Sequence, residues 1–185
     1  RQLESLPEKE RKMYLAGSWD VFVGQFFTEF NRNIHVCRPF VPKSDAPKIA
    51  GIDWGYSPRP FVFVASVIRK EKTEGGQPFT RVITFKEIEG RDTIPEDWAR
   101  KIIKDCYLSE FSYIRADPSM FHKKPDGSIS IADQMKPELK EHATLLKPAN
   151  NDRIGGWAML HKWLSLAPDG LPYWLIAENC QNLIA

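Results

Sequence analysis

Two aspartates, each at the end of a short apolar run, are the residues of this sequence best suited to chemistry. Asp53 ends the run Lys-Ile-Ala-Gly-Ile-Asp and precedes Trp54-Gly55, whereas Asp117 ends Phe-Ser-Tyr-Ile-Arg-Ala-Asp and precedes Pro118. Both runs are rich in β-favouring residues, and the proline ends its strand because it cannot donate to a ladder. Open α/β sheets keep their chemistry at the carboxyl ends of their strands. The sequence therefore predicts two carboxylates at one edge of a sheet.

Two carboxylates at such an edge could hold divalent metal ions. Phosphodiester hydrolysis requires both the attacking and the leaving oxygen to be neutralised, which two ions about 3.5–4 Å apart achieve. Mg²⁺ takes oxygen ligands and keeps several waters, and Mn²⁺ accepts the same oxygens. We therefore predict that Asp53 and Asp117 are catalytic residues that bind two Mg²⁺ or Mn²⁺ ions. For either acid alone the alternative is structural, because an aspartate after a strand often caps a turn or helix.

Basic residues follow the second acid where loops and helix starts are expected: Lys123, Lys124, Lys147 and Arg153. These side chains are predicted to contact DNA phosphates beside the acids, with a merely solvated face as the alternative. The histidines are expected in packing or solvent, with His35 in a loop. The chain has no Gly-x-x-x-x-Gly-Lys-Ser/Thr sequence, so a phosphate-binding loop of that type is not predicted.

The composition fits an ordinary globular protein and leaves its partner open. A formal net charge of +2 over 185 residues does not by itself indicate nucleic acid, because a local patch matters more than a total. The three cysteines form no C-x-x-C pair, so a reduced, intracellular setting is expected. Neither a signal peptide nor an apolar run of about 20 residues is found, so no membrane association is predicted. Because the chain begins with Arg1, we expect it to be a piece of a longer protein.

The first 47 residues are expected to precede the main domain. Their pattern predicts a helix over 4–16, an extended aromatic stretch over 19–30, and a linker over 37–47 in which three prolines recur. The main domain is therefore predicted to span 48–185.

Alternating strand and helix patterns fill this main domain. Antiparallel strands are predicted over 48–54, 60–69 and 80–89, followed by a helix over about 94–108 with a capping box at Thr93. The remaining elements are a strand at 112–117, a short helix from Ser130, a strand at 144–147, a helix from an Asn151 cap to about 166, and a strand at 173–177. Three strands followed by alternating helices and strands give the order of the ribonuclease H-like fold, a mixed α/β sheet with helices on both faces. That analogy concerns the fold and not the function.

Asp53-Trp54-Gly55 also has a rival interpretation. Sugar-kinase and actin-like ATPases begin with a similar Asp-x-Gly, in which the glycine lets the backbone approach a phosphate. Such proteins need a duplicated domain, for which 185 residues leave no room.

Several blocks, in order and at matching spacing, resemble one family. The segment beginning Leu6-Pro-Glu-Lys-Glu-Arg and the segment Gly24-Gln-Phe-Phe-Thr-Glu-Phe resemble the region that joins the two domains of tailed-bacteriophage terminase large subunits. Four further blocks resemble the nuclease domain of that family: Gly51-Ile-Asp-Trp-Gly, Ala116-Asp-Pro, Asn151-Asp-Arg-Ile-Gly-Gly and Glu178-Asn-Cys-Gln-Asn-Leu-Ile.

This resemblance implies a metal-dependent endonuclease that cuts concatemeric double-stranded DNA during viral genome packaging. By the matching blocks, Asp53 corresponds to the first metal-binding acid and Asp117 to the second. The resemblance further implies an N-terminal ATPase domain in the same polypeptide, the small terminase subunit and the portal protein as partners. The expected location is the cytoplasm of the infected bacterial host, transiently at the procapsid portal.

The sequence departs from the family pattern in three respects. The third acid of the family usually lies near an Asp-His-x-x-Asp-Ala-Leu stretch, which this chain lacks, so a nuclease domain truncated at its C-terminus is predicted. The ATPase is also absent from these residues, and His161 stands where the family often has arginine. A non-cleaving module for DNA docking or motor assembly, with structural acids, is the alternative function.

Overall fold

The computed structural model describes residues 26–123 and 127–185, and the chain divides into two compact units, 1–30 and 31–185. The predicted helix over 4–16 and most of the predicted aromatic stretch lie outside the described residues. Within the first unit, the Phe26 and Phe27 rings meet edge to face with centroids 4.7 Å apart. The Phe30 N–H donates to the Phe27 carbonyl, so the described end of this stretch is a turn rather than a strand.

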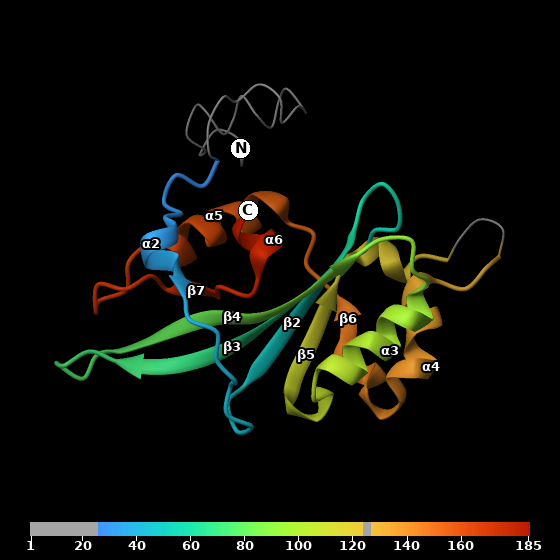
Figure 1. The fold of residues 1–185 in the computed structure, drawn as a ribbon, viewed down its shortest axis with the longest axis horizontal. Helices are drawn as coiled ribbons and strands as arrows, with labels where there is room; N and C mark the ends of the chain where they lie inside the picture. The colour runs from blue at the N-terminus through green and yellow to red at the C-terminus, as the bar shows by residue number, and fades with distance from the viewer. Residues whose placement is uncertain (1–25, 124–126) are drawn as a thin grey trace. The chain divides into compact units, whose positions relative to one another are not determined.

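A seven-stranded mixed sheet organises the second unit (Figure 1). Its strands are β1 (Val36–Cys37), β2 (Lys48–Asp53), β3 (Phe61–Lys72), β4 (Pro78–Gly90), β5 (Phe111–Ala116), β6 (Leu146–Pro148) and β7 (Trp174–Ala177). The α-helices are α2 (Arg32–His35), α3 (Pro95–Asp105), α4 (Ile131–Leu139), α5 (Arg153–Leu164) and α6 (Gln181–Ile184). Short 3₁₀ helices complete the unit: η2 (Leu108–Glu110), η3 (Pro118–Phe121) and η4 (Lys140–Leu145).

The strand order is β1-β7-β4-β3-β2-β5-β6. The strands β2, β3 and β4 form the predicted antiparallel meander, and β5 and β6 then join β2 in parallel. On the other side β7 pairs in parallel with both β4 and β1. A mixed sheet of this order is the predicted ribonuclease H-like arrangement, so the fold class is confirmed.

One face of the sheet packs against α3 and α4 and forms the main core. Alternate residues of β3 point to this face, and the fully buried Phe61 ring stacks on Trp98 of α3 with centroids 4.4 Å apart. Helix α3 supplies Ile102 and α4 supplies Met135, both completely buried. Burial of each such large side chain contributes about 1.5–3 kcal/mol. This face therefore holds β2 and β5 rigidly beside each other.

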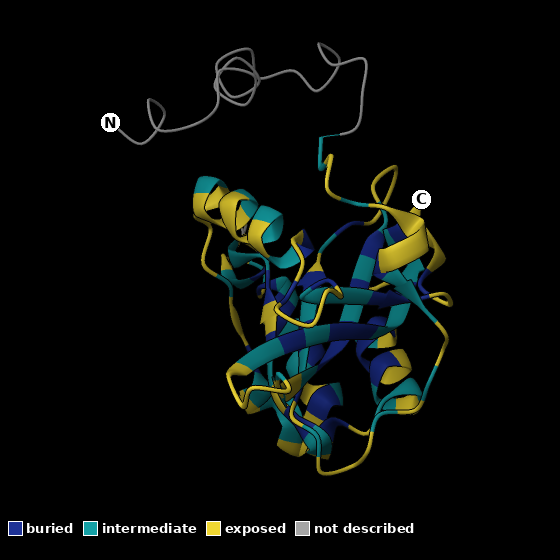
Figure 2. Cartoon of the chain, turned by 90° about the vertical axis from the view of Figure 1, so that its left-hand side faces the viewer, coloured by how far each residue is buried: buried dark blue, intermediate teal, exposed yellow. Residues whose placement is uncertain are grey.

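The opposite face is covered less completely. It carries α5, whose Leu160 and Trp163 side chains lie over Ile49, Val64 and other residues of the sheet along a groove of about 440 Å³. Within α5 only Leu164 is buried. Figure 2 shows that the strands are largely dark blue and teal, whereas the loops and outer helix surfaces are yellow. Helices thus lie on both faces, as predicted, but only one face is tightly packed.

Two helix caps differ from the sequence prediction. Helix α5 is capped by Asp152 rather than Asn151, and the Asp152 carboxylate accepts from the Gly155 N–H at 3.0 Å. The N-cap position of α3 is Ile94, because Thr93 instead donates its hydroxyl to the Arg91 carbonyl. Each cap lies one residue from its predicted position. At α5 the neighbouring Asn151 and Asp152 compete for the same role, whereas at α3 the Thr93 hydroxyl bonds elsewhere and the cap position has no side-chain hydrogen bond.

The segment before β2 is also more structured than a linker. Its residues form α2 and β1, and His35, predicted in a loop, is buried at the end of α2 with its Nε2 2.9 Å from the Leu164 carbonyl oxygen. The compact unit begins at residue 31, while the domain boundary at residue 47 stays a prediction. None of the helices in the described part is long and apolar enough to cross a membrane.

Candidate functional site

Asp53 and Asp117 lie at the carboxyl ends of neighbouring parallel strands. Asp53 is the last residue of β2, and Asp117 directly follows β5. The register pairs Ile52 with Ala116, and the Asp117 N–H donates to the Ile52 carbonyl at 3.1 Å. Since Ile52 belongs to the core beside α3 and α4, side-chain alternation directs the Asp53 carboxylate to the opposite side of the sheet. The structure thus brings both predicted acids to one edge of the sheet.

The electrostatic environment of Asp53 reflects this proximity. Partial burial raises the pKa of Asp53 above its ordinary value, and the negative charge of Asp117 raises it further. The Arg59 guanidinium and the Trp54 N–H lower the same pKa and offset part of the rise. A carboxylate whose ionisation is disfavoured by burial and by a second carboxylate is stabilised when a cation binds between them. The charge distribution at this edge therefore favours a bound cation.

Asp117 also has a structural role. Its Oδ1 accepts a hydrogen bond from the Ser119 N–H at 2.6 Å, so it caps the short helix η3. This contact orients the carboxylate and leaves its second oxygen available to another ligand. The structural alternative raised from the sequence is therefore realised at Asp117, but it does not exclude a metal-binding role for the same side chain.

Glycine is required in the loop that follows Asp53. A Cβ on Gly55 would overlap the carbonyl oxygens of Pro60 and Arg59, so the loop can fold back this closely only around a glycine. The Tyr56 carbonyl accepts from the Asp92 N–H at 3.0 Å and fixes the far side of the loop. This fold places the Arg59 guanidinium within electrostatic reach of Asp53.

Lys147 and Arg153 lie where the sequence predicted basic residues near the acids. The exposed Lys147 on β6 is in register with Arg115 on β5, two residues before Asp117. Arg153 is exposed as the first residue of α5, a helix that begins five residues after β6 ends. Of the predicted basic residues, Lys147 is therefore placed beside the strand that carries the second acid.

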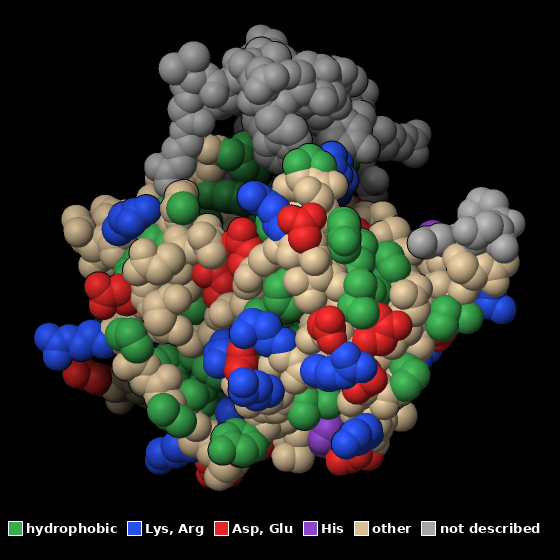
Figure 3. Space-filling model, turned by 45° about the vertical axis from the view of Figure 1, so that its right-hand side comes forward, with side chains coloured by type: hydrophobic (Ala, Val, Ile, Leu, Met, Phe, Trp, Pro, Cys, Tyr) green, Lys and Arg blue, Asp and Glu red, His purple; other side chains and the backbone are tan. Residues whose placement is uncertain are grey.

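Lys123 has a different neighbour, and Lys124 lies outside the described residues. The pKa of Asp133 is lowered mainly by hydrogen bonds from Lys136 and Ser130, with a smaller contribution from the charge of Lys123. Lys123 therefore lies near the start of α4. On the face that Figure 3 brings forward, Lys, Arg, Asp and Glu side chains are interspersed rather than separated by sign.

Sequence reasoning missed two arginines near the acids. Arg59 reaches Asp53 electrostatically, and Arg115 lies on the exposed side of β5 with its guanidinium 5.1 Å from the centre of the Tyr113 ring. The Arg115 Nη1 donates to the Pro148 carbonyl at 3.4 Å. Alternation at the end of β5 could have identified Arg115, because it is the exposed position between the buried Ile114 and Ala116. The position of Arg59 near Asp53 depends on how the intervening loop folds back. In the sequence, Gly55 alone indicates such a fold.

The donor set fits a hard divalent cation. Within residues 26–123 and 127–185, no group of three or more His, Cys, Asp or Glu side chains is placed to hold a metal ion. The two aspartates offer only carboxylate oxygens, the ligands preferred by Mg²⁺ and Mn²⁺, which retain waters in their other coordination positions. A structural zinc site, with four nitrogen or sulfur ligands, does not fit this edge.

No protein-family model and no curated protein sequence matches the chain. Solved structures do match its fold. The nuclease domain of the P22 large terminase matches with a TM-score of 0.56 and 14% identity, over 87% of this chain and 76% of that chain. The large terminase of a thermophilic bacteriophage, in complex with ATP-gamma-S, matches with a TM-score of 0.57 and 18% identity, over 97% of this chain and 43% of that chain.

These similarities show that the chain has the fold of large-terminase nuclease domains. A second structure of the large terminase from the same thermophilic bacteriophage matches over 85% of this chain and 35% of its own length, with a TM-score of 0.56. The chain thus spans less than half of that large terminase. The resemblance first seen in short sequence blocks is therefore supported at the level of the fold.

Proposed function

We propose that this chain is the metal-dependent endonuclease module of a viral DNA-packaging terminase and cuts concatemeric double-stranded DNA. The observation that carries the proposal is the juxtaposition of Asp53 and Asp117 at adjacent strand ends, in a fold shared with terminase nuclease domains. The fold alone would not suffice, because one fold supports many functions. The proposal therefore rests on the carboxylate pair and its electrostatics.

In the proposed mechanism Asp53 and Asp117 hold two Mg²⁺ or Mn²⁺ ions. When bound, such ions supply charge stabilisation for the attacking and leaving oxygens of the phosphodiester. Asp53 contributes a carboxylate that protein groups only partly neutralise. Asp117 contributes a carboxylate that its hydrogen bond to Ser119 orients. The role of the chain itself is thus to hold two carboxylate ligands at rigid strand ends.

The basic side chains have a positioning role in this proposal. Lys147 and Arg153 are proposed to bind the phosphates of the DNA strand, together with Lys123 and Lys124 earlier in the chain. Arg115 is added to this set because it is exposed and in register with Lys147. Such contacts fix the register of the duplex on the protein without reading its sequence.

The partners and location follow from the same proposal. As part of a terminase, the chain would work beside an N-terminal ATPase domain of its own polypeptide and would meet the small terminase subunit and the portal protein. It would act in the cytoplasm of the infected bacterial host, transiently at the procapsid portal. Of these partners, only DNA would bind at the carboxylate site, so DNA cleavage is the activity to test.

Nicking of a supercoiled plasmid tests the proposal. The chain is expected to nick DNA with Mn²⁺ or Mg²⁺ and to stop when the metal is chelated, and Asp53→Asn is expected to lower the rate by about 100-fold or more. Asp105→Asn is the matched control, since Asp105 forms an exposed ion pair with Lys101 on α3. Mn²⁺ binding measured by calorimetry should weaken in Asp53→Asn and not in Asp105→Asn. If plasmid binds but is not cut with either metal, the chain is a non-cleaving docking module.

A further inference from the structure

A second charged groove lies at the opposite end of β2 from the acids. It has a volume of about 670 Å³ and runs between the loop at 40–46 and the end of β3 at 67–71. Five residue steps of β2 separate Lys48 from Asp53, which corresponds to roughly 17 Å at about 3.3 Å per residue. The groove is therefore distinct from the carboxylate site.

One side of this groove is an open sheet edge. β3 is paired with β4 along its whole length, but β2 pairs with it only as far as Val67. The Ile68 N–H donates to the Pro47 carbonyl on the β2 side, whereas the Thr73 N–H donates to the Gln77 carbonyl within the hairpin. Because the hydrogen-bonding direction alternates along an antiparallel strand, the backbone groups of Lys70 and Lys72 point to the unpaired edge. No strand in the described part of the chain occupies this edge.

The other side of the groove is a loop that is fixed in place. The Lys48 side chain is only 4% exposed, and its Nζ donates to the carbonyls of Lys43 at 2.6 Å, Ser44 at 3.4 Å and Ala46 at 3.3 Å. The same ammonium lies 2.8 Å from a carboxylate oxygen of Glu110. A buried ammonium with every donor satisfied holds the loop rigidly. The groove is therefore preformed rather than created by a mobile segment.

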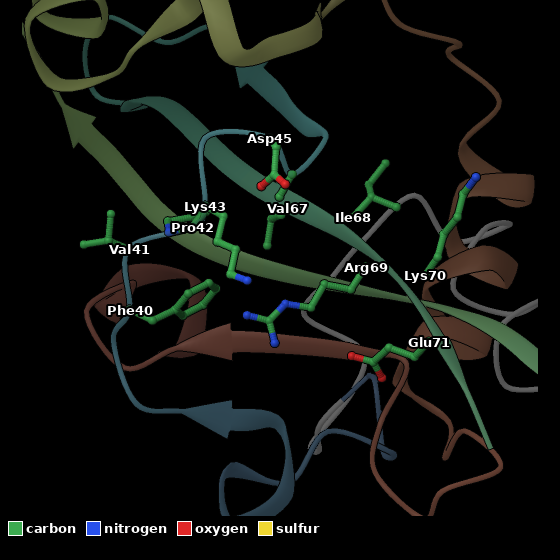
Figure 4. Close-up of a pocket in the computed structure, with 11 residues that line it drawn as sticks. Phe40, Val41, Pro42, Lys43, Asp45, Val67, Ile68, Arg69, Lys70 and Glu71 are labelled. Atoms are coloured by element: carbon green, nitrogen blue, oxygen red, sulfur yellow. The ribbon is translucent and has the colours of Figure 1, made fainter. Parts of the chain in front are cut away.

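The groove carries an excess of positive charge. Figure 4 shows the Lys43 ammonium and the Arg69 guanidinium directed toward the same space, beside the Phe40 ring. Arg69 lies 5.1 Å from the centre of that ring, and neither cation forms a salt bridge with a described residue. The groove is lined by three cations, Lys43, Arg69 and Lys70, and by two acids, Asp45 and Glu71, of which Glu71 pairs with Arg81. Two cations that converge without an anion between them are stabilised by an anionic ligand.

The open edge carries basic side chains on both faces, with the acidic Glu71 beside Arg69 on one of them. Arg69 and Glu71 point to the side of Phe40, whereas Figure 4 shows Lys70 directed away from them. Lys70 and Lys72 are both exposed. A strand added at this edge would therefore place its alternate side chains near Lys43 and Arg69 on one face and near Lys70 and Lys72 on the other.

We propose that this groove binds an acidic segment of a partner polypeptide, which adds in extended conformation to the edge of β3. The open backbone groups supply main-chain hydrogen bonds, and the four cations select acidic side chains. The apolar walls, with Phe40 half-buried and Val41 93% exposed, suit intervening aliphatic side chains. A nucleic acid phosphate backbone is a poorer fit because it cannot use an alternating backbone edge. The proposal goes beyond the nuclease function and does not depend on it.

Binding of a labelled peptide to the full chain tests this proposal. The probe is a fluorescein-labelled peptide of about eight alternating glutamate and valine residues, the length of a typical strand. At low salt its anisotropy should rise with the chain, while a peptide with glutamine in place of glutamate should bind about tenfold more weakly. The double variant Lys43→Gln with Arg69→Gln should lose about three- to tenfold in affinity and should nick plasmid like the wild type. A labelled DNA duplex serves as the competing ligand.

A backbone variant separates strand addition from simple charge attraction. Lys70→Pro removes the outward N–H, which β4 does not use, and should weaken binding by about tenfold beyond the matched Lys70→Gln variant. On the unmutated chain, the peptide should slow hydrogen exchange at the Lys70 and Lys72 amides. This measurement tests the proposal even if Lys70→Pro fails to fold. Equal binding of the glutamine peptide, unchanged exchange at both amides, or binding of the duplex without the acidic peptide would each overturn the proposal.

Discussion

The charged side chains at the two ends of β2 differ in how far protein groups compensate them. At its start, Lys48 is buried and its ammonium is fully occupied by three loop carbonyls and by Glu110. At its end, Asp53 is exposed and its nearest charged neighbours include a second carboxylate, Asp117. A buried charge is tolerated only when protein groups compensate it, so the charge of Lys48 is structural. The charge of Asp53 is compensated only in part, by Arg59 and the Trp54 N–H, as expected of a side chain whose partner is a ligand.

The largest effect is expected when the compensated charge is removed. Lys48→Met keeps the apolar stem but leaves the loop carbonyls and Glu110 without their cation, which should lower the free energy of unfolding by about 3 kcal/mol. Urea denaturation measures this change. Lys101→Met is the control, because Lys101 makes an exposed pair with Asp105 at 3.1 Å whose loss should cost less than about 1 kcal/mol. Equal losses in the two variants would mean that burial does not distinguish these lysines.

The next effect concerns the loop at the acidic end. Gly55→Ala places a methyl group against the Pro60 and Arg59 carbonyls and should destabilise the protein by about 2 kcal/mol, since backbone must move. Plasmid nicking should also fall, because the shifted loop directly follows Asp53 and would displace its carboxylate. The matched control is Gly156→Ala on α5, where a Cβ meets nothing within 4 Å and helix propensity should add about 0.5–1 kcal/mol of stability. Thermal unfolding measures the stability of both variants. Stability changes of the same sign in Gly55→Ala and Gly156→Ala would contradict this prediction.

The two roles of Asp117, capping η3 and binding metal, can be separated by substitutions that affect stability less than Gly55→Ala does. Asp117→Asn keeps an oxygen that can accept from the Ser119 N–H, so stability should change by less than about 0.5 kcal/mol, whereas Asp117→Ala should cost about 1 kcal/mol. Both substitutions remove the carboxylate and should abolish metal-dependent nicking. Denaturation and nicking are measured on the same samples. Full activity in Asp117→Asn would leave Asp117 with its capping role only.

Sequence patterns were sufficient to predict the elements that position the acids. The apolar, β-favouring runs that end at Asp53 and Asp117 predicted β2 and β5 to within one residue, because both strands are bounded by clear signals. Parallel pairing of β2 with β5 then followed from the order of the elements. The two acids were predictable for the same reason, since a residue just after a strand end lies at the sheet edge regardless of longer-range packing.

Contacts between distant segments were not predictable in the same way. β1 has only two residues, Val36 and Cys37, and joins the sheet through β7, which lies about 140 positions later in the chain. The groove at the start of β2 depends on how far β3 extends past β2, a difference in strand length that no local pattern encodes. The N-cap of α5 lies one residue from its predicted position, because the adjacent Asn151 and Asp152 differ little as capping residues. The N-cap of α3 moved because the Thr93 hydroxyl bonds the Arg91 carbonyl instead.

The smallest expected effect is the pH dependence of stability, which distinguishes the two ends of β2 without disturbing either. The pKa of Asp53 is raised in the folded protein, first by burial and then by Asp117, so the folded state binds its proton more tightly than the unfolded state. The metal-free protein should therefore lose stability as the pH rises from the ordinary pKa of an aspartate through the raised one. Because Asp53 is largely exposed, the loss should stay below about 1 kcal/mol. Asp53→Asn should not show it.

Mn²⁺ should reverse this dependence if Asp53 is a metal ligand. The ion binds the ionised carboxylate, so stabilisation by Mn²⁺ should grow as the pH rises through the same window in the wild type and be absent in Asp53→Asn. Glu138 provides a control of opposite sign. The hydrogen bond from Arg100 lowers the pKa of Glu138, so its contribution to the stability of the wild type is lost as the pH falls, and Glu138→Gln should lack that loss. Thermal unfolding across this pH range, with and without Mn²⁺, measures all three proteins. If Mn²⁺ stabilised Asp53→Asn as much as the wild type, the cation would bind elsewhere, and the contrast between the two ends of β2 would not concern metal binding.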